Sequence, residues 1–289
     1  MPRQTMVSVI ERTAAWLADK GVDSPRLDAE LLVCHVLGLE RLQLYLQFDR
    51  PFSDSELAAL RPLVRRRGLR EPLAWILGER GFHALDLQVD RDVLVPRPDT
   101  ETLVDAALED IPEDSDEPVY VADIGCGTGA VGLAVAAARP QVRLYAVDLS
   151  PQALANTKAN VERLGLKDRV AVLRGDLLDP IPESRPIDWV LSNPPYIPSA
   201  DIDALMPEVS THEPRLALDG GPDGLDIIRR LIAQAVPRVR RGLRVELGAG
   251  QAAAVMQLLR EAGLEDVRSW ADLAGIDRIV GGVKPRSSA

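Results

Sequence analysis

Cysteine and histidine are scarce in this sequence, with two and three copies respectively. Cys34 and Cys126 are too few for the disulfide framework of a small secreted protein. His35, His83 and His212 are scattered, and no cysteine and histidine cluster has metal-ligand spacing. We therefore expect structural or surface roles for the histidines, no metal centre, and a protein that works under reducing conditions.

Long hydrophobic runs and an excess of basic charge are also missing. The longest apolar stretch, around Ala130–Ala138, is far too short to cross a bilayer, and Met1–Ile10 lacks the architecture of a signal peptide. The formal net charge of −10 argues against a protein that binds nucleic acid by neutralising its phosphates. These absences predict a cytoplasmic protein with no membrane and no nucleic acid as a direct partner.

The length of 289 residues is enough for two domains, each with its own core. Up to about Gly78 apolar residues recur at helical spacing, and Ser53 followed by Glu56 has the spacing of a helix capping box. Between Phe82 and Val95 apolar and polar residues alternate, which predicts a β-hairpin. We expect a helical domain over residues 1–78, a hairpin linker over 79–96 and a catalytic domain over 97–289.

From Val119 onwards, predicted strands alternate with predicted helices. The strands are expected over residues 119–124, 143–147, 170–173, 189–191, 243–247, 267–270 and 278–280, and the helices between them over 131–138, 151–164, 225–236 and 251–261. This alternation is typical of an α/β domain with a mostly parallel, Rossmann-like sheet covered on both faces.

Three consecutive strand ends carry residues suited to a nucleoside. The loop Gly125-Cys126-Gly127-Thr128-Gly129 follows the first strand, and its glycines let the main chain turn sharply against a ligand. Asp148 ends the second strand, where its carboxylate is placed to accept both ribose hydroxyls. Asp176 and Leu177 end the third, where the acid would accept from an adenine amino group and the leucine would pack on the ring.

This set resembles the class I S-adenosylmethionine-dependent methyltransferases, whose seven-stranded sheet has its last strand antiparallel. The rival cofactor, NAD(P), calls for a third glycine at a further three-residue spacing, but position 130 is alanine and the next glycine is Gly132. The resemblance implies that the three strand ends bind S-adenosylmethionine and release S-adenosylhomocysteine, with no metal involved.

The fourth strand ends in Asn193-Pro194-Pro195-Tyr196. A nitrogen conjugated to a carbonyl or a ring is a poor nucleophile, so its hydrogens must be engaged for its lone pair to point at the methyl carbon. The Asn193 side-chain oxygen and the Pro194 carbonyl supply two acceptors, the prolines stiffen that carbonyl, and Tyr196 offers a flat surface. We therefore predict methylation of a planar nitrogen, by positioning and local electrostatics rather than by a dedicated base.

Other segments indicate which nitrogen is methylated. Glu71–Gly78, Val95–Glu101, Glu213–Gly221 and Asp272–Arg278 all resemble the peptide chain release factor glutamine methyltransferases. The related ribosomal-protein glutamine methyltransferases have a PRSP-type segment where this chain has PRPDTE at Pro96–Glu101. The difference favours the release-factor branch.

This resemblance implies an N-terminal domain that recognises the substrate, and a methyl acceptor that is the glutamine of a Gly-Gly-Gln loop in class I release factors. Asn193 would contact the cofactor, and Asn193–Tyr196 the glutamine. Val95 occupies the position of a hydrophobic pocket residue and is smaller than the common phenylalanine. We expect the protein to act as a monomer.

Three alternatives remain from the sequence. The first is methylation of a glutamine in a ribosomal protein, and the second is methylation of an exocyclic amino group of a nucleic-acid base. The third is a regulator that binds the cofactor without catalysis, which the intact acceptor motif disfavours.

Overall fold

The computed structural model of the protein describes residues 4–285. The chain divides into a smaller unit, Met1–Gly78 with Met206–His212, and a larger unit, Glu79–Leu205 with Glu213–Ala289. This division differs from the expected one in two respects. The hairpin belongs to the larger unit, and a short segment from the second half of the chain belongs to the smaller one. Within residues 4–285, no helix is long and apolar enough to cross a membrane.

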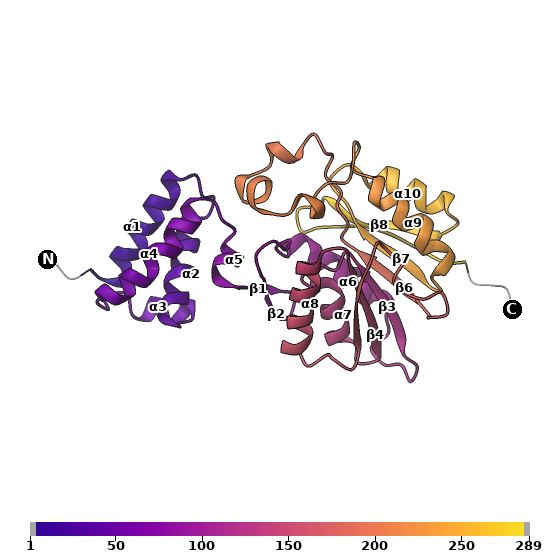
Figure 1. Ribbon diagram of the computed structural model, residues 1–289, viewed down its shortest axis with the longest axis horizontal. Helices are drawn as coiled ribbons and strands as arrows, with labels where there is room; N and C mark the ends of the chain where they lie inside the picture. The colour runs from indigo at the N-terminus through magenta and orange to yellow at the C-terminus, as the bar shows by residue number, and fades with distance from the viewer. Residues whose placement is uncertain (1–3, 286–289) are drawn as a thin grey trace. The chain divides into compact units, whose positions relative to one another are not determined.

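The smaller unit is helical (Figure 1). Its helices are α1 (Met6–Asp19), α2 (Pro25–Leu37), α3 (Arg41–Leu46), α4 (Asp54–Gly68) and α5 (Leu73–Leu77). The predicted capping box is confirmed: the Glu56 N–H donates to Ser53 Oγ at 3.3 Å, and the Ser53 N–H donates to Glu56 Oε2 at 2.8 Å. These two bonds satisfy donors that the first turn of α4 would otherwise leave without partners.

A buried ion-pair network joins Met206–His212 to the rest of the smaller unit. Arg67 is 7% exposed, and it donates to Asp28 Oδ2 at 2.6 Å and to Glu208 Oε1 at 2.8 Å. Arg70 donates to the other oxygen of Glu208 at 2.6 Å. Removing one partner of a buried pair leaves a desolvated charge uncompensated. The network therefore explains why this segment, which is distant in sequence, packs with α4.

The larger unit contains a seven-stranded sheet (Figure 1). Its strands are β3 (Val119–Ile124), β4 (Val142–Asp148), β5 (Val170–Arg174), β6 (Trp189–Ser192), β7 (Gly242–Glu246), β8 (Glu265–Ala271) and β9 (Asp277–Val283). Their order is β5-β4-β3-β6-β7-β9-β8, and β9 runs antiparallel to both of its neighbours. The predicted fold class is confirmed.

Helices cover both faces of this sheet. They are α6 (Glu101–Asp110), α7 (Ala130–Ala138), α8 (Pro151–Arg163), α9 (Asp226–Arg238) and α10 (Ala252–Glu261). Leu103, Val131 and Leu154, from α6, α7 and α8, belong to one buried apolar cluster. Ile228 and Val255, from α9 and α10, belong to a second. The two clusters leave the carboxyl ends of the parallel strands available for a site, as in other open α/β sheets.

The hairpin is shorter than the sequence pattern predicts. Strand β1 (Glu79–Phe82) pairs with β2 (Leu85–Gln88), whereas Val93 and Val95 lie in a loop. Both valines are buried, so their spacing of two residues reflects side-chain packing and not strand pairing. Two amides of α8 hold β2: the Gln88 N–H donates to Asn160 Oδ1 at 2.8 Å, and Asn156 Nδ2 donates to the Gln88 carbonyl at 3.1 Å.

We predict that Glu208→Ala lowers the free energy of unfolding by about 3 kcal/mol, because it leaves the buried Arg67 and the half-buried Arg70 short of a partner. Chemical denaturation of the full protein, followed by circular dichroism, measures this loss. Glu162→Ala is the matched control, since Glu162 pairs with Lys167 at 65% side-chain exposure and its loss should cost less than about 1 kcal/mol. Equal losses in the two variants would contradict a stabilising role for the buried network.

Candidate active site

The carboxyl ends of β3, β4, β5 and β6 surround a cavity of about 480 Å³. It brings together most of the predicted site residues, namely Gly125, Gly127, Asp148, Asp176, Leu177, Asn193, Pro194 and Pro195. The predicted residues that do not line it are Cys126, Thr128, Gly129, Tyr196 and Val95. These five residues are close neighbours of lining residues in the chain. Their contacts with the lining residues and with other parts of the fold show what each can do for the site.

The glycine loop folds over the end of β4. Gly125, Gly127 and Gly129 have positive φ angles of 72°, 57° and 83°, which side chains rarely tolerate. The N–H groups of Gly125 and Cys126 donate to the Val147 carbonyl at 2.9 and 3.0 Å. These bonds fix the loop at the edge of the cavity, with its main chain next to any ligand there.

Cys126 and Thr128 support this loop from behind. Both are buried, and the Cys126 Sγ lies 3.4 Å from the Thr157 hydroxyl. Burial raises the pKa of the Cys126 thiol well above its usual value. The thiol is therefore neutral and serves packing. The Thr128 carbonyl accepts from Asn160 Nδ2 at 2.9 Å, which ties the loop to α8.

Asp148 is held by main-chain donors on both carboxylate oxygens. The Gly127 N–H donates to Oδ2 at 2.9 Å and the Ser150 N–H donates to Oδ1 at 2.8 Å. Burial raises the pKa of this carboxyl group. Each carboxylate oxygen keeps a further lone pair, so the group can still accept two hydroxyl hydrogens from a ligand.

Asp176 and Leu177, which follow β5, also line the cavity. The Asp176 carboxylate pairs with Arg230 of α9, and both residues line the cavity. Leu177 has a φ of 47°, in the left-handed region. A leucine in this region costs of order 1–3 kcal/mol, and such strain clusters at ligand sites. This left-handed conformation turns the main chain at Leu177, at the edge of the cavity.

Polar contacts hold the acceptor segment at both ends. Asn193 Nδ2 donates to Thr100 Oγ1 at 3.1 Å, and the Tyr196 hydroxyl donates to Glu246 Oε1 at 3.2 Å. Burial, and next to it the Glu246 carboxylate, raises the pKa of Tyr196. Within residues 4–285 no hydrogen bond reaches the Pro194 carbonyl. That carbonyl is therefore available as an acceptor beside the cavity.

Val95 contributes through its main chain. It is buried, and its N–H donates to Glu213 Oε1 at 3.4 Å. Glu213 also pairs with Arg97, and burial raises its pKa in spite of that arginine. The contact joins two segments more than a hundred residues apart. The cavity itself is lined by the neighbours Val93 and Leu94.

Thr100 and Glu246 contact the acceptor segment, and the sequence analysis singled out neither of them as a site residue. Glu246 is 1% exposed at the end of β7, and burial raises the pKa of its carboxyl group to about 7. One signal in the sequence could have revealed Glu246. It is a carboxylate at the end of a strand that is otherwise mostly apolar, and that strand is the neighbour of the one that carries the acceptor motif.

Comparison with known proteins identifies the family. The model of the PrmC N-terminal domain matches residues 8–78, and that of the methyltransferase small domain matches residues 102–212. The release factor glutamine methyltransferase of Geobacter sulfurreducens is 45% identical over 280 residues, which cover 96% of each chain. The chain belongs to the release factor glutamine methyltransferase family. The family member from Rhodopirellula baltica is 42% identical over 282 residues, covering 96% of this chain and 95% of that one.

A solved structure supports the same architecture. The hMettl16 catalytic domain in complex with MAT2A 3′UTR hairpin 1 aligns with a TM-score of 0.54, over 82% of this chain and 83% of that one. At 16% sequence identity this likeness shows the fold alone.

Two alanine variants separate the strain in the glycine loop from crowding. An added Cβ at Gly127 meets nothing within 4 Å, whereas at Gly129 it would lie 2.7 Å from the buried Leu133 Cδ1. Gly127→Ala should cost about 1–2 kcal/mol for its left-handed conformation. Gly129→Ala should cost about 1–3 kcal/mol more through overpacking. Denaturant titration of both variants measures the difference, and equal stabilities would show that the loop relaxes freely.

Proposed function

We propose that this protein transfers the methyl group of S-adenosylmethionine to the side-chain amide nitrogen of the glutamine in the Gly-Gly-Gln motif of class I release factors. The observation that carries this proposal is the acceptor segment. Asn193 has its amide NH₂ committed to Thr100, on the wall of a cavity that also presents Asp148. Membership of the release factor glutamine methyltransferase family supports the choice of substrate.

The cavity residues fit the proposed cofactor. Asp148 would accept the ribose hydroxyls, because its oxygens keep lone pairs beyond their two main-chain bonds. The main chain at Gly125 and Gly127 would lie against the ligand, and Leu177 would pack against the adenine. When bound, S-adenosylmethionine supplies an electrophilic methyl group. The product would be S-adenosylhomocysteine.

The chain's own residues would orient the glutamine. The Asn193 side-chain oxygen and the Pro194 carbonyl would accept the two amide hydrogens, which turns the nitrogen lone pair towards the methyl carbon. Such positioning is the main source of rate here, and it requires no metal. Within residues 4–285, no group of three or more His, Cys, Asp and Glu side chains could hold a metal ion.

The proposed activity is tested by incubating the protein with methyl-labelled S-adenosylmethionine and a class I release factor. We expect one methyl group per release factor, located by mass spectrometry on the glutamine of the Gly-Gly-Gln motif. A release factor with that glutamine changed to alanine is the control and should stay unlabelled. Equal labelling of both factors, or transfer to ribosomal protein or nucleic acid at the same rate, would refute the assignment.

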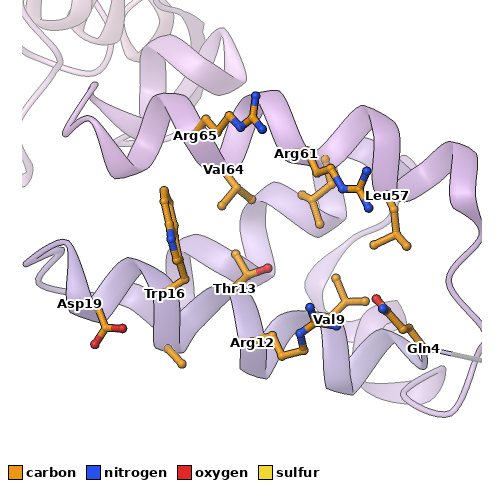
Figure 2. Close-up of a pocket in the computed structure, with 12 residues that line it drawn as sticks. Gln4, Val9, Arg12, Thr13, Trp16, Asp19, Leu57, Arg61, Val64 and Arg65 are labelled. Atoms are coloured by element: carbon orange, nitrogen blue, oxygen red, sulfur yellow. The ribbon is translucent and has the colours of Figure 1, made fainter. Parts of the chain in front are cut away.

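The smaller unit carries a groove that suits a protein partner. A cavity of about 620 Å³ lies between α1 and α4, with Trp16, Thr13 and Val64 among the side chains that line it (Figure 2). Its apolar floor is edged by Arg12, Arg61 and Arg65, all exposed. Among the described residues these three arginines have no ion pair or side-chain hydrogen bond. We propose that the groove binds an acidic segment of the release factor.

Charge reversal in the groove tests this role. The double variant Arg12→Glu with Arg61→Glu should raise KM for the intact release factor about tenfold or more, because like charges would meet across the interface. Methylation of a short Gly-Gly-Gln peptide should not change. Lys158→Glu with Arg185→Glu is the matched control, since it changes the net charge equally at exposed sites of the larger unit. A parallel loss on factor and peptide would limit the groove to a structural role.

A further inference from the structure

Glu246 is a deeply buried carboxylate in contact with the acceptor segment. Its residue is 1% exposed, and one of its oxygens, Oε1, accepts from the Tyr196 hydroxyl at 3.2 Å. The Thr100 hydroxyl also interacts with this carboxylate and lowers its pKa. Oε2 has no hydrogen-bond partner within residues 4–285, so this carboxylate has room to accept a further hydrogen. A buried carboxylate is costly, and the fold keeps one here with few donors.

Hydrogen-bond donors and acceptors can be assigned in one consistent way along the contacts from Glu246 through Thr100 to Asn193. An ionised carboxylate only accepts, and a threonine hydroxyl has a single hydrogen. When Thr100 gives its hydrogen to Glu246, its oxygen is left to accept from Asn193. The Asn193 amide must then turn its NH₂ towards Thr100, as observed at 3.1 Å. Its oxygen consequently points away from Thr100.

This orientation decides whether the site can bind its acceptor. A glutamine amide offers two N–H donors at its nitrogen, so it needs oxygen atoms from the enzyme. If the Asn193 amide were flipped, its own NH₂ would face the NH₂ of the substrate, and a hydrogen bond would be replaced by a clash of donors. An asparagine without a fixed partner has no means to select between the two orientations.

We propose that Glu246 is the positioning residue of the acceptor site, acting through Thr100 to present the Asn193 oxygen to the substrate amide and through Tyr196 to fix the other end of the segment. This inference rests on the proposed function for the identity of the acceptor. It adds the reason why a carboxylate, and not a neutral amide, stands at position 246. We call the contacts from Glu246 through Thr100 to Asn193 the relay. A glutamine at position 246 could donate as well as accept, so it would not determine which way the hydrogen bonds of the relay run.

Two nearly isosteric substitutions test the relay. Glu246→Gln and Thr100→Val should each lower kcat tenfold to a hundredfold, with the Kd for S-adenosylmethionine changed less than threefold. Thr100→Ser keeps the hydroxyl and should recover most of the activity lost in Thr100→Val. Glu265→Gln, at an exposed position of β8, controls for the loss of one charge. Wild-type kcat in Glu246→Gln would overturn the proposal, as would equal kcat values for Thr100→Ser and Thr100→Val.

The pH dependence provides a second readout. The pKa of Glu246 is raised to about 7, chiefly by burial. The nearby Asp99 also raises this pKa, whereas Thr100, Tyr196 and Arg278 oppose the rise. Below that pH the protonated carboxyl group can donate, so the relay loses its direction and kcat should fall. Burial raises the pKa of Asp123 to about 7 as well, and Asp123 is present in every variant. Only an acidic limb that disappears in Glu246→Gln reports the relay, and a limb that persists unchanged would contradict it.

A substrate-free measurement separates this inference from the proposed function. In nitrogen-15 spectra, the side-chain NH₂ signal of Asn193 should titrate with a midpoint near pH 7 in the wild-type protein and stay constant in Glu246→Gln. If the wild-type enzyme labels no release factor while this titration is still seen, the proposed function is contradicted and the relay is not. If the Asn193 signal changes neither with pH nor with the substitution, the relay is contradicted, whatever the substrate.

Discussion

The burial of carboxylates beside the carboxyl ends of the sheet is the constraint on which the site depends. Glu213 and Glu246 are buried and Asp148 is half-buried at the cavity, and burial raises the pKa of each carboxyl group. A buried carboxylate is costly, and hydrogen-bond donors from the segments around it offset part of that cost. Each carboxylate therefore holds a particular segment in place: Asp148 holds the glycine loop through Gly127, Glu213 holds the loop after β2 through Arg97, and Glu246 holds the acceptor motif through the Tyr196 hydroxyl.

These contacts assemble a site from segments that are far apart in the chain. Thr100 meets Asn193 across 93 positions, and Glu246 meets Tyr196 across 50. The sheet makes such meetings possible because β6 lies between β3 and β7, so the ends of all three strands open on the same edge. The helices on the two faces fix the strands, and the buried carboxylates fix the loops. Rigid positioning follows from both, and positioning is the main catalytic resource for a weak amide nucleophile.

Features that depend on neighbouring residues could be predicted from the sequence, whereas contacts between residues far apart in the chain could not. The Ser53 capping box and the alternation of strands and helices could be predicted because each depends on neighbouring residues. Glu208 could not be assigned to the smaller unit, because its partners Arg67 and Arg70 stand about 140 positions earlier. Glu246 was hidden in the same way, since the pattern predicted its strand but not the hydroxyl groups that meet its carboxylate.

The carboxyl groups with a pKa near 7 also bear on the chemistry. Asp123 and Glu246 have the acidity expected of a general base at neutral pH, yet neither lines the cavity. Asp123 accepts the Gly132 N–H at the start of α7, and Glu246 faces Tyr196. A group that does not reach the cavity cannot take a proton from a ligand there directly. Their perturbed acidity is the consequence of burying the charges that hold the loops, so in this site a pKa near 7 marks the scaffold of the acceptor and not its base.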